Sequence, residues 1–234
     1  MAIVNKTFRC GVTLRYDNSD SYESKVENYG HINPSLEFWL NNNASNYSNA
    51  LVVGAGFGLS SKQLVEAGAT VTSIEPNSFR YNLLEDNVPE STNINKAVGS
   101  SAGTSNISYY GDNLSGGKLD GGFEFDDSIE VITVDSLDLT LDLMLVYANG
   151  KELDVIAGAS ETIANNPGMK IIMKWVPDLL DDVSASITQL QSLDKTIHII
   201  HWEEDDSISL RTQFNGDHHD DILVGVQHAD LLLE

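Results

Sequence analysis

Three glycines at alternate positions and one acid further along the chain could together hold a ligand. The apolar run ALVV, residues 50–53, leads directly into Gly54, Gly56 and Gly58. The next apolar run, TVTSIE, ends on Glu75, 17 residues beyond Gly58. In a parallel sheet the carboxyl ends of two neighbouring strands meet at one ligand crevice, where an acid can accept hydrogen bonds from ribose hydroxyls. The spacing therefore predicts a site for a ligand that contains ribose.

The glycine spacing separates two classes of ribose-containing ligand. A dinucleotide fingerprint needs Gly-x-Gly-x-x-Gly/Ala, but the sixth position counted from Gly54 is Leu59. The observed Gly-x-Gly-x-Gly lets the backbone pass close beneath a ligand that has no pyrophosphate, such as the methionine part of S-adenosylmethionine. We therefore favour S-adenosylmethionine as the cofactor and keep a nicotinamide-dependent reductase as an alternative.

The elements that must position these residues alternate between strand and helix from residue 50 onward. A strand-like apolar run at 50–53 is followed by a helical pattern at 60–68, and a second run at 70–75 is followed by a helical pattern at 77–87. The alternation continues along the chain, with strands expected at 93–99, 141–148, 169–175 and 196–202 and helices at 152–165 and 178–193. Such alternation predicts an α/β protein with a doubly wound, mostly parallel sheet covered by helices on both faces.

Three regions depart from this alternation. Residues 1–48 are polar, with one short helix candidate at 34–40, and we expect a cap or lid segment over the sheet edge in front of a main domain at 49–234. Residues 99–128 are rich in glycine and predict a long loop. Residues 206–214 and 221–234, joined by a polar turn, predict a C-terminal antiparallel hairpin that closes the sheet.

Three stretches of the chain resemble FkbM-type methyltransferases, which depend on S-adenosylmethionine. They are the glycine turn with its EP segment (residues 52–88), NINKAVGSSAGTSNI (93–107), and IEVITVDSLDLTLDLMLVYANGKELDVIAGA (129–159), which is similar to that family's Thr-x-x-Asp-x-Leu stretch and the segment after it. The resemblance implies a seven-strand, Rossmann-like class I methyltransferase fold and O-methylation of a hydroxyl on a sugar or small metabolite. It also implies a set of cofactor-binding residues: Gly54, Ala55, Gly56, Phe57, Gly58, Glu75, Pro76, Ala97 and Tyr147.

Four positions where that family carries an acid hold another residue here. They are Val52, Tyr147, Asn149 and Lys174. Because these four acids are missing near the expected active face, a second interpretation stays open: the protein binds the cofactor but does not catalyse methyl transfer.

Methylation of a hydroxyl needs a general base within hydrogen-bond reach of the acceptor, and four residues could supply it. Glu152 and Tyr147 are the catalytic residues that we predict, and His31 and His201 are further candidates. Each also has a structural interpretation. An acid in the first turn of a helix stabilises the helix dipole, as Glu152 would, and His201 alternates with apolar residues as a packed strand histidine does. Tyr147 can fill space at the strand end.

Composition and charge exclude several classes of partner. The net charge is −22, and only 13 lysines and arginines are scattered along the chain, so we expect no nucleic-acid partner. The single Cys10, and the absence of a signal-peptide pattern or a membrane-length apolar segment, predict a cytoplasmic protein without a membrane partner. The DHHDD run at 217–221 predicts no metal site, because adjacent turn residues rarely converge on one point. We expect a small-molecule or glycan substrate.

Overall fold

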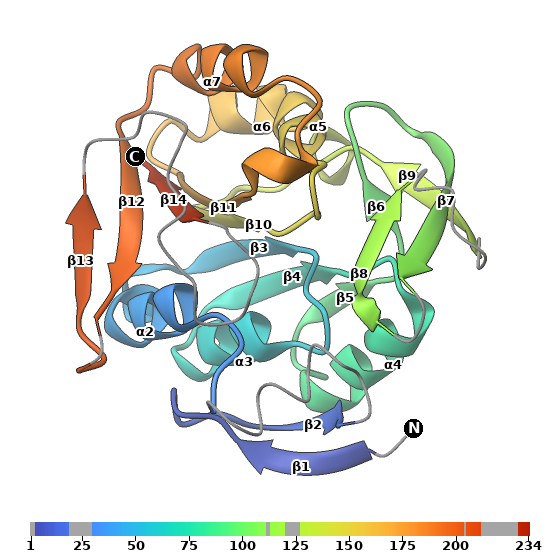
Figure 1. The fold of residues 1–234 in the computed structure, drawn as a ribbon, viewed down its shortest axis with the longest axis vertical. Coiled ribbons are helices and arrows are strands. Elements are labelled where there is room, and N and C mark those ends of the chain that lie inside the picture. Colours follow the sequence, from blue (N-terminus) through green and yellow to red (C-terminus); the bar gives the residue numbers. More distant parts are fainter. Residues whose placement is uncertain (1–2, 19–29, 111–112, 120–126, 204, 212–228) are drawn as a thin grey trace.

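The computed structural model describes residues 3–18, 30–110, 113–119, 127–203, 205–211 and 229–234. Its centre is an eight-stranded sheet with the order β13-β12-β14-β11-β10-β3-β4-β5 (Figure 1). The strands are β3 (Asn49–Val53), β4 (Thr70–Ile74), β5 (Thr92–Ile94), β10 (Leu143–Val146), β11 (Lys170–Trp175), β12 (Ile197–Trp202), β13 (Ile208–Arg211) and β14 (Ala229–Leu233).

Helices cover both faces of this sheet, as the strand–helix alternation predicts. One face carries α2 (Pro34–Asn43), α3 (Leu59–Glu66) and α4 (Ser78–Asn87), and the other carries α5 (Glu152–Ala157), α6 (Ser160–Asn165) and α7 (Val183–Gln191) (Figure 1). Asn77 caps α4, since its side chain accepts a hydrogen bond from the Arg80 amide, and Gly68 follows the end of α3 with a φ of +100°. The doubly wound α/β prediction is confirmed.

The central strands are apolar because both of their faces are buried. All four residues of β10 are buried, and in β3 only Asn49 is exposed. Side chains on one face join a core with α5 and α7, and those on the other face join a core with α2, α3 and α4. This double burial is typical of parallel strands between helical layers.

The carboxyl end of the chain is antiparallel, as predicted, but the strands pair differently from a simple hairpin. The strand β14 lies between β11 and β12 and runs antiparallel to both, while β13 pairs antiparallel with β12 at the sheet edge. The predicted partners 206–214 and 221–234 therefore do not pair with each other where they are described. The all-buried sequence ADLLL of β14 explains its place, since an edge strand would expose one side of it.

The predicted loop at 99–128 is wrong where the structure describes this segment. The strands β6 (Ala97–Val98), β7 (Gly103–Tyr110), β8 (Asn113–Leu119) and β9 (Asp127–Ile132) form a second sheet with the order β6-β9-β7-β8. Strand pairing uses main-chain N–H and C=O groups, so glycine-rich segments can pair when neighbouring strands are at hand.

The amino-terminal segment begins with a hairpin, β1 (Ile3–Thr7) and β2 (Thr13–Asp17), and the predicted short helix is α2. The hairpin buries Phe8, Leu14 and Tyr16 against Phe57 of the glycine turn and Leu83 of α4. The hairpin therefore packs beside the glycine turn, while α2 of the same amino-terminal segment lies against β12 and the edge strand β13. Whether residues 1–48 act as a lid stays a prediction.

Candidate functional site

The glycine turn lies between β3 and α3, at the carboxyl ends of the parallel strands. Gly54, Gly56 and Gly58 have φ values of +78°, +58° and +102°, which favour glycine. A Cβ atom on Gly54 would lie 2.0 Å from the carbonyl oxygen of Tyr147, and one on Gly58 would lie 2.7 Å from a methyl group of Val88. Two of the three glycines are thus required by close packing within the protein.

The backbone of the turn is accessible at Gly54 and Gly56, while Ala55, Phe57 and Gly58 are buried. The Phe57 ring stacks on Phe8, with ring centroids 6.0 Å apart, and so it points toward the amino-terminal hairpin. Of the five predicted cofactor residues in the turn, Gly54 and Gly56 therefore offer the surface that a ligand could touch.

Glu75 follows β4 and faces the same turn. One carboxylate oxygen, Oε2, accepts a hydrogen bond from the Gly56 amide at 2.8 Å, and Oε1 accepts one from the Asn77 amide at 2.8 Å. Burial raises the pKa of Glu75, and the nearby positive charge of Arg80 opposes this. Each carboxylate oxygen can accept a second hydrogen bond, so the group retains capacity for a ligand.

The segment after β5 is tied to Glu75 and Pro76. The Asn95 amide donates to the carbonyl oxygens of Glu75 and Pro76 at 2.8 and 3.1 Å. Ala97, two residues further on, is buried in β6. The structure thus brings the predicted cofactor residues of the glycine turn, Glu75 and Pro76 and the segment at 95–97 to one edge of the sheet.

Tyr147 follows β10 at this edge and joins a polar cluster that no sequence motif indicates. Its hydroxyl donates to Oδ1 of Asp230 at 2.7 Å, and the Asn33 amide donates to the same oxygen at 3.2 Å. Asp230 is fully buried and is paired across the sheet with Lys174 of β11. The only sequence signal for Asp230 is an acid inside the apolar run ADLLL, which carries no motif.

Glu152, the other predicted catalytic residue, holds the loop after Tyr147. Its carboxylate oxygens accept hydrogen bonds from the amides of Ala148 and Gly150 at 3.0 and 2.9 Å. Burial raises its pKa, and the charge of Lys174 opposes the rise. Burial lowers the pKa of Lys174, while Glu152 and Asp230 oppose that change. Glu152 therefore fixes loop geometry at the edge where Tyr147 lies.

The two histidine candidates have contacts of their own. His31 is buried against Trp202, with ring centroids 5.3 Å apart, and burial lowers its pKa. His201 on β12 places Nε2 3.5 Å from Oε1 of Glu203. His31 packs against an aromatic ring and His201 lies within an apolar strand, and a catalytic role for either stays a prediction.

Two further expectations concern metal and membrane. The DHHDD run at 217–221 falls outside the described residues. Within the described part of the chain, no group of three or more His, Cys, Asp or Glu residues could hold a metal ion. Among the same residues, no helix has the length and apolarity that crossing a membrane requires.

A buried acid, Glu37 of α2, orders the segment that carries Asn33. Its Oε1 accepts hydrogen bonds from the amides of Ile32 and Asn33 at 2.7 and 2.8 Å. Burial raises the pKa of Glu37 from 4.5 to about 7, against the lowering effect of these hydrogen bonds. The state of Glu37 is thereby linked to the position of Asn33, and Asn33 donates to Asp230.

We expect Glu37 to make the protein less stable as the pH rises. A carboxyl whose pKa is higher in the folded state contributes its full stability below pH 4.5 and loses it as the pH passes about 7. Between pH 5 and pH 8 this loss should be about 2–3 kcal/mol. Urea unfolding at both pH values, on wild type and Glu37→Gln, measures it. The glutamine variant should lack that part of the pH dependence, and an identical dependence in both proteins would refute the assignment.

Comparisons with known proteins place the fold but not a family. No family model matches the chain, and no curated protein matches it. Among solved structures, a TehB-like SAM-dependent methyltransferase from Corynebacterium glutamicum superposes with a TM-score of 0.52 at 11% identity, over 91% of this chain and 92% of that one. A SAM-dependent methyltransferase from Agrobacterium tumefaciens gives 0.50 at 10% identity, over 100% and 70% of the two chains. Trm5b from Pyrococcus abyssi gives 0.50 at 10% identity, over 100% and 55%.

These similarities and the strand order define the fold as that of the class I S-adenosylmethionine-dependent methyltransferases. Seven of the eight strands, in the order β12-β14-β11-β10-β3-β4-β5, form the sheet that the resemblance implies. The eighth strand, β13, is added at one edge.

Proposed function

We propose that this protein binds S-adenosylmethionine over Gly54–Gly58 and transfers its methyl group to a hydroxyl of a small molecule or glycan. The observation that carries the proposal is the position of Glu75. Its buried carboxylate faces the accessible backbone at Gly56, at the carboxyl edge of a sheet with the methyltransferase strand order. Ligands of open α/β sheets bind at this edge.

The residues present fit the cofactor. Gly56 has a positive φ and an accessible backbone, and a Cβ atom there would lie 3.3 Å from Nη1 of Arg80, so a side chain would crowd the surface that we assign to the ligand. We assign the ribose hydroxyls to the remaining acceptor capacity of Glu75, and the methionine part to the backbone of Gly54 and Gly56. Pro76 and the segment that ends at Ala97 would border the adenine. When bound, S-adenosylmethionine supplies a methyl group that its sulfonium activates.

The acceptor side of the site would be built around Tyr147. Its backbone lies against Gly54, and its hydroxyl donates to the buried carboxylate of Asp230. An acceptor hydroxyl would donate to the Tyr147 oxygen, which also lies 3.5 Å from Nδ2 of Asn33. As the acceptor loses its proton, that proton would pass to the Tyr147 oxygen while the proton of Tyr147 moves to Oδ1 of Asp230. The Tyr147–Asp230 pair would thus take the place of the two acids that the FkbM-type pattern has where this chain has Tyr147 and Asn149.

The class of acceptor follows from charge and resemblance. A net charge of −22 repels a phosphate backbone, which supports a small-molecule or glycan acceptor over a nucleic acid. The likeness of residues 50–175 to FkbM-type methyltransferases supports the same choice. The other readings are a cofactor-binding protein that does not catalyse and a nicotinamide-dependent reductase, and Leu59 argues against the reductase.

Transfer of a labelled methyl group tests the function and the role of Tyr147 together. Wild-type protein should label an acceptor within a panel of monosaccharides and small hydroxylated metabolites and should leave total RNA unlabelled. Tyr147→Phe removes only the hydroxyl and should lower turnover by about 100-fold or more, because general acid–base groups contribute at least that much. Its affinity for S-adenosylhomocysteine should stay within about twofold of wild type.

Each contrary outcome of this assay has a distinct meaning. Labelled RNA would show that the acceptor class is wrong. Binding of S-adenosylhomocysteine without labelling of any acceptor would favour the non-catalytic alternative. A Tyr147→Phe protein as active as wild type would remove Tyr147 from the proton path, and melting curves on both proteins check that the variant is folded.

A further inference from the structure

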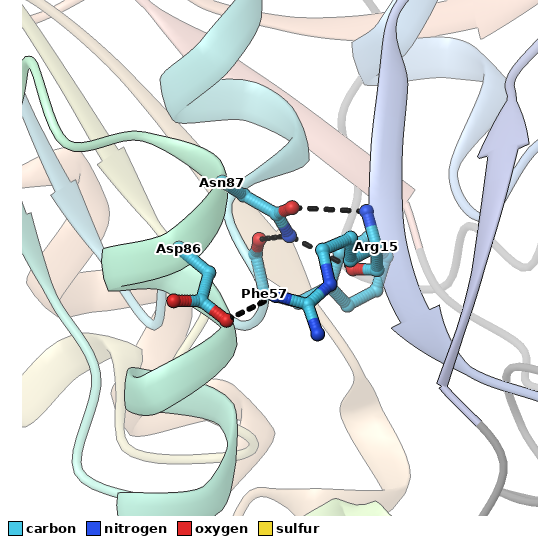
Figure 2. Close-up of polar contacts among 4 residues, drawn as sticks. All are labelled: Arg15, Phe57, Asp86 and Asn87. Carbon is cyan, nitrogen blue, oxygen red and sulfur yellow. Dashed lines mark hydrogen bonds and ion pairs between the residues drawn. The ribbon is translucent and has the colours of Figure 1, made fainter.

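The amino-terminal hairpin and the glycine turn are joined through one side chain of α4, Asn87. Its Oδ1 accepts a hydrogen bond from the Arg15 amide at 2.9 Å, and its Nδ2 donates to the Arg15 carbonyl oxygen at 2.8 Å (Figure 2). The same Nδ2 donates to the carbonyl oxygen of Phe57 at 2.8 Å. Asn87 thus pairs with the main chain of β2 as a neighbouring strand would, and also with the main chain of the turn.

Apolar packing reinforces this connection from the other side of the turn. Phe8, Tyr16 and Phe57 are at most 3% exposed, and their ring centroids lie 6.0 to 6.3 Å apart. Leu59, the first residue of α3, belongs to the same cluster. The turn is therefore anchored at Phe57 by the hairpin, while Gly56 on its accessible side is held by Glu75.

We infer that Asn87 is a positioning residue for the cofactor site: by bonding to the main chain of both β2 and Phe57, it holds the glycine turn in its ligand-binding shape before the ligand arrives. The inference rests on the proposed function for the identity of the ligand. Its physical basis is preorganisation: a backbone that is already fixed in the bound conformation loses less conformational entropy on binding. Asn87 need not touch the ligand to affect its affinity.

The exposed ion pair beside Asn87 provides a matched control. The Arg15 guanidinium lies 2.5 Å from Oδ2 of Asp86, and about half of each side chain is exposed (Figure 2). Exposed pairs of this kind contribute little to stability. Arg15→Gln removes the pair but keeps the Arg15 main-chain groups that Asn87 binds, so it changes the hairpin surface without releasing the turn.

Calorimetric titration with S-adenosylhomocysteine and amide hydrogen exchange test the inference on the full chain. Asn87→Ala should weaken binding by about tenfold, and exchange of the amides at 54–58 should become faster in the unliganded protein. Arg15→Gln should match wild type in both measurements. Should Asn87→Ala fail to fold, Asn87→Asp replaces it, because it keeps the acceptor for the Arg15 amide and loses both Nδ2 bonds.

The outcomes separate this inference from the proposed function. A folded Asn87 variant with wild-type affinity and wild-type exchange at 54–58 would overturn the inference. A wild-type protein that does not bind S-adenosylhomocysteine would overturn the proposed function instead. In that case the exchange data still decide whether Asn87 holds the turn.

Discussion

Glu75→Gln should weaken binding of S-adenosylhomocysteine by about 10- to 100-fold. The Glu75 carboxylate faces the glycine turn and accepts a hydrogen bond from the Gly56 amide. Hydrogen bonds to charged groups are worth about 1.5–3 kcal/mol, and each tenfold change in affinity corresponds to 1.4 kcal/mol. Glutamine keeps the size of the side chain and one acceptor oxygen, so it removes the charge with little change in shape.

The same substitution should also cost some stability. Glu75 accepts hydrogen bonds from the Gly56 and Asn77 amides, and glutamine can satisfy only one of them with its oxygen. A buried amide without a partner costs about 1–3 kcal/mol. Asp135→Asn is a matched control, because Asp135 likewise accepts from two main-chain amides, those of Glu161 and Thr162. Calorimetry on both variants should show an affinity loss in Glu75→Gln alone, and equal affinities would remove Glu75 from the cofactor site.

Val52→Asp should destabilise the protein instead of restoring a cofactor contact. Val52 stands where the FkbM-type pattern has an acid, and an accessible strand end would let an aspartate reach the cofactor's ammonium. The structure shows a different environment: Val52 is 2% exposed, within the core that α2 and α3 cover. An uncompensated buried charge costs about 3–5 kcal/mol. For a chain of this length, that corresponds to a melting temperature lower by about 10 °C.

Val52→Thr is the control for this substitution, since threonine has nearly the same shape and adds only a hydroxyl. It should cost about 1–3 kcal/mol, less than the aspartate. Differential scanning calorimetry measures both variants. A Val52→Asp protein that melts like wild type and binds S-adenosylhomocysteine more tightly would show that the strand end opens to the ligand.

The parts of the fold that the sequence predicts are those with local signals. The run at 50–53, the three glycines and the helical pattern at 77–87 are each encoded within a few residues, and the structure places β3, the turn and α4 there. Pairing between distant segments has no such signal. Residues 103–110 form β7 only because β8 and β9 lie beside them. Likewise, nothing near Ala229–Leu233 indicates that β14 enters between β11 and β12.

The candidate site divides in the same way. Gly56 and Glu75 belong to a pattern with fixed spacing, and the structure joins them by a hydrogen bond. Asp230 lies 83 residues from Tyr147 in the sequence and Asn87 lies 72 residues from Arg15. Their roles depend on which strands and helices become neighbours, so sequence spacing cannot identify them.

A crystal structure of the protein grown with S-adenosylhomocysteine would test the central claim most directly. We expect the ligand to lie over Gly54–Gly58, with its two ribose hydroxyls within 2.6–3.2 Å of the Glu75 carboxylate and its sulfur facing Tyr147. A ligand bound elsewhere, or a glycine turn that remains empty at saturating ligand concentration, would contradict the proposal that this turn is a cofactor site.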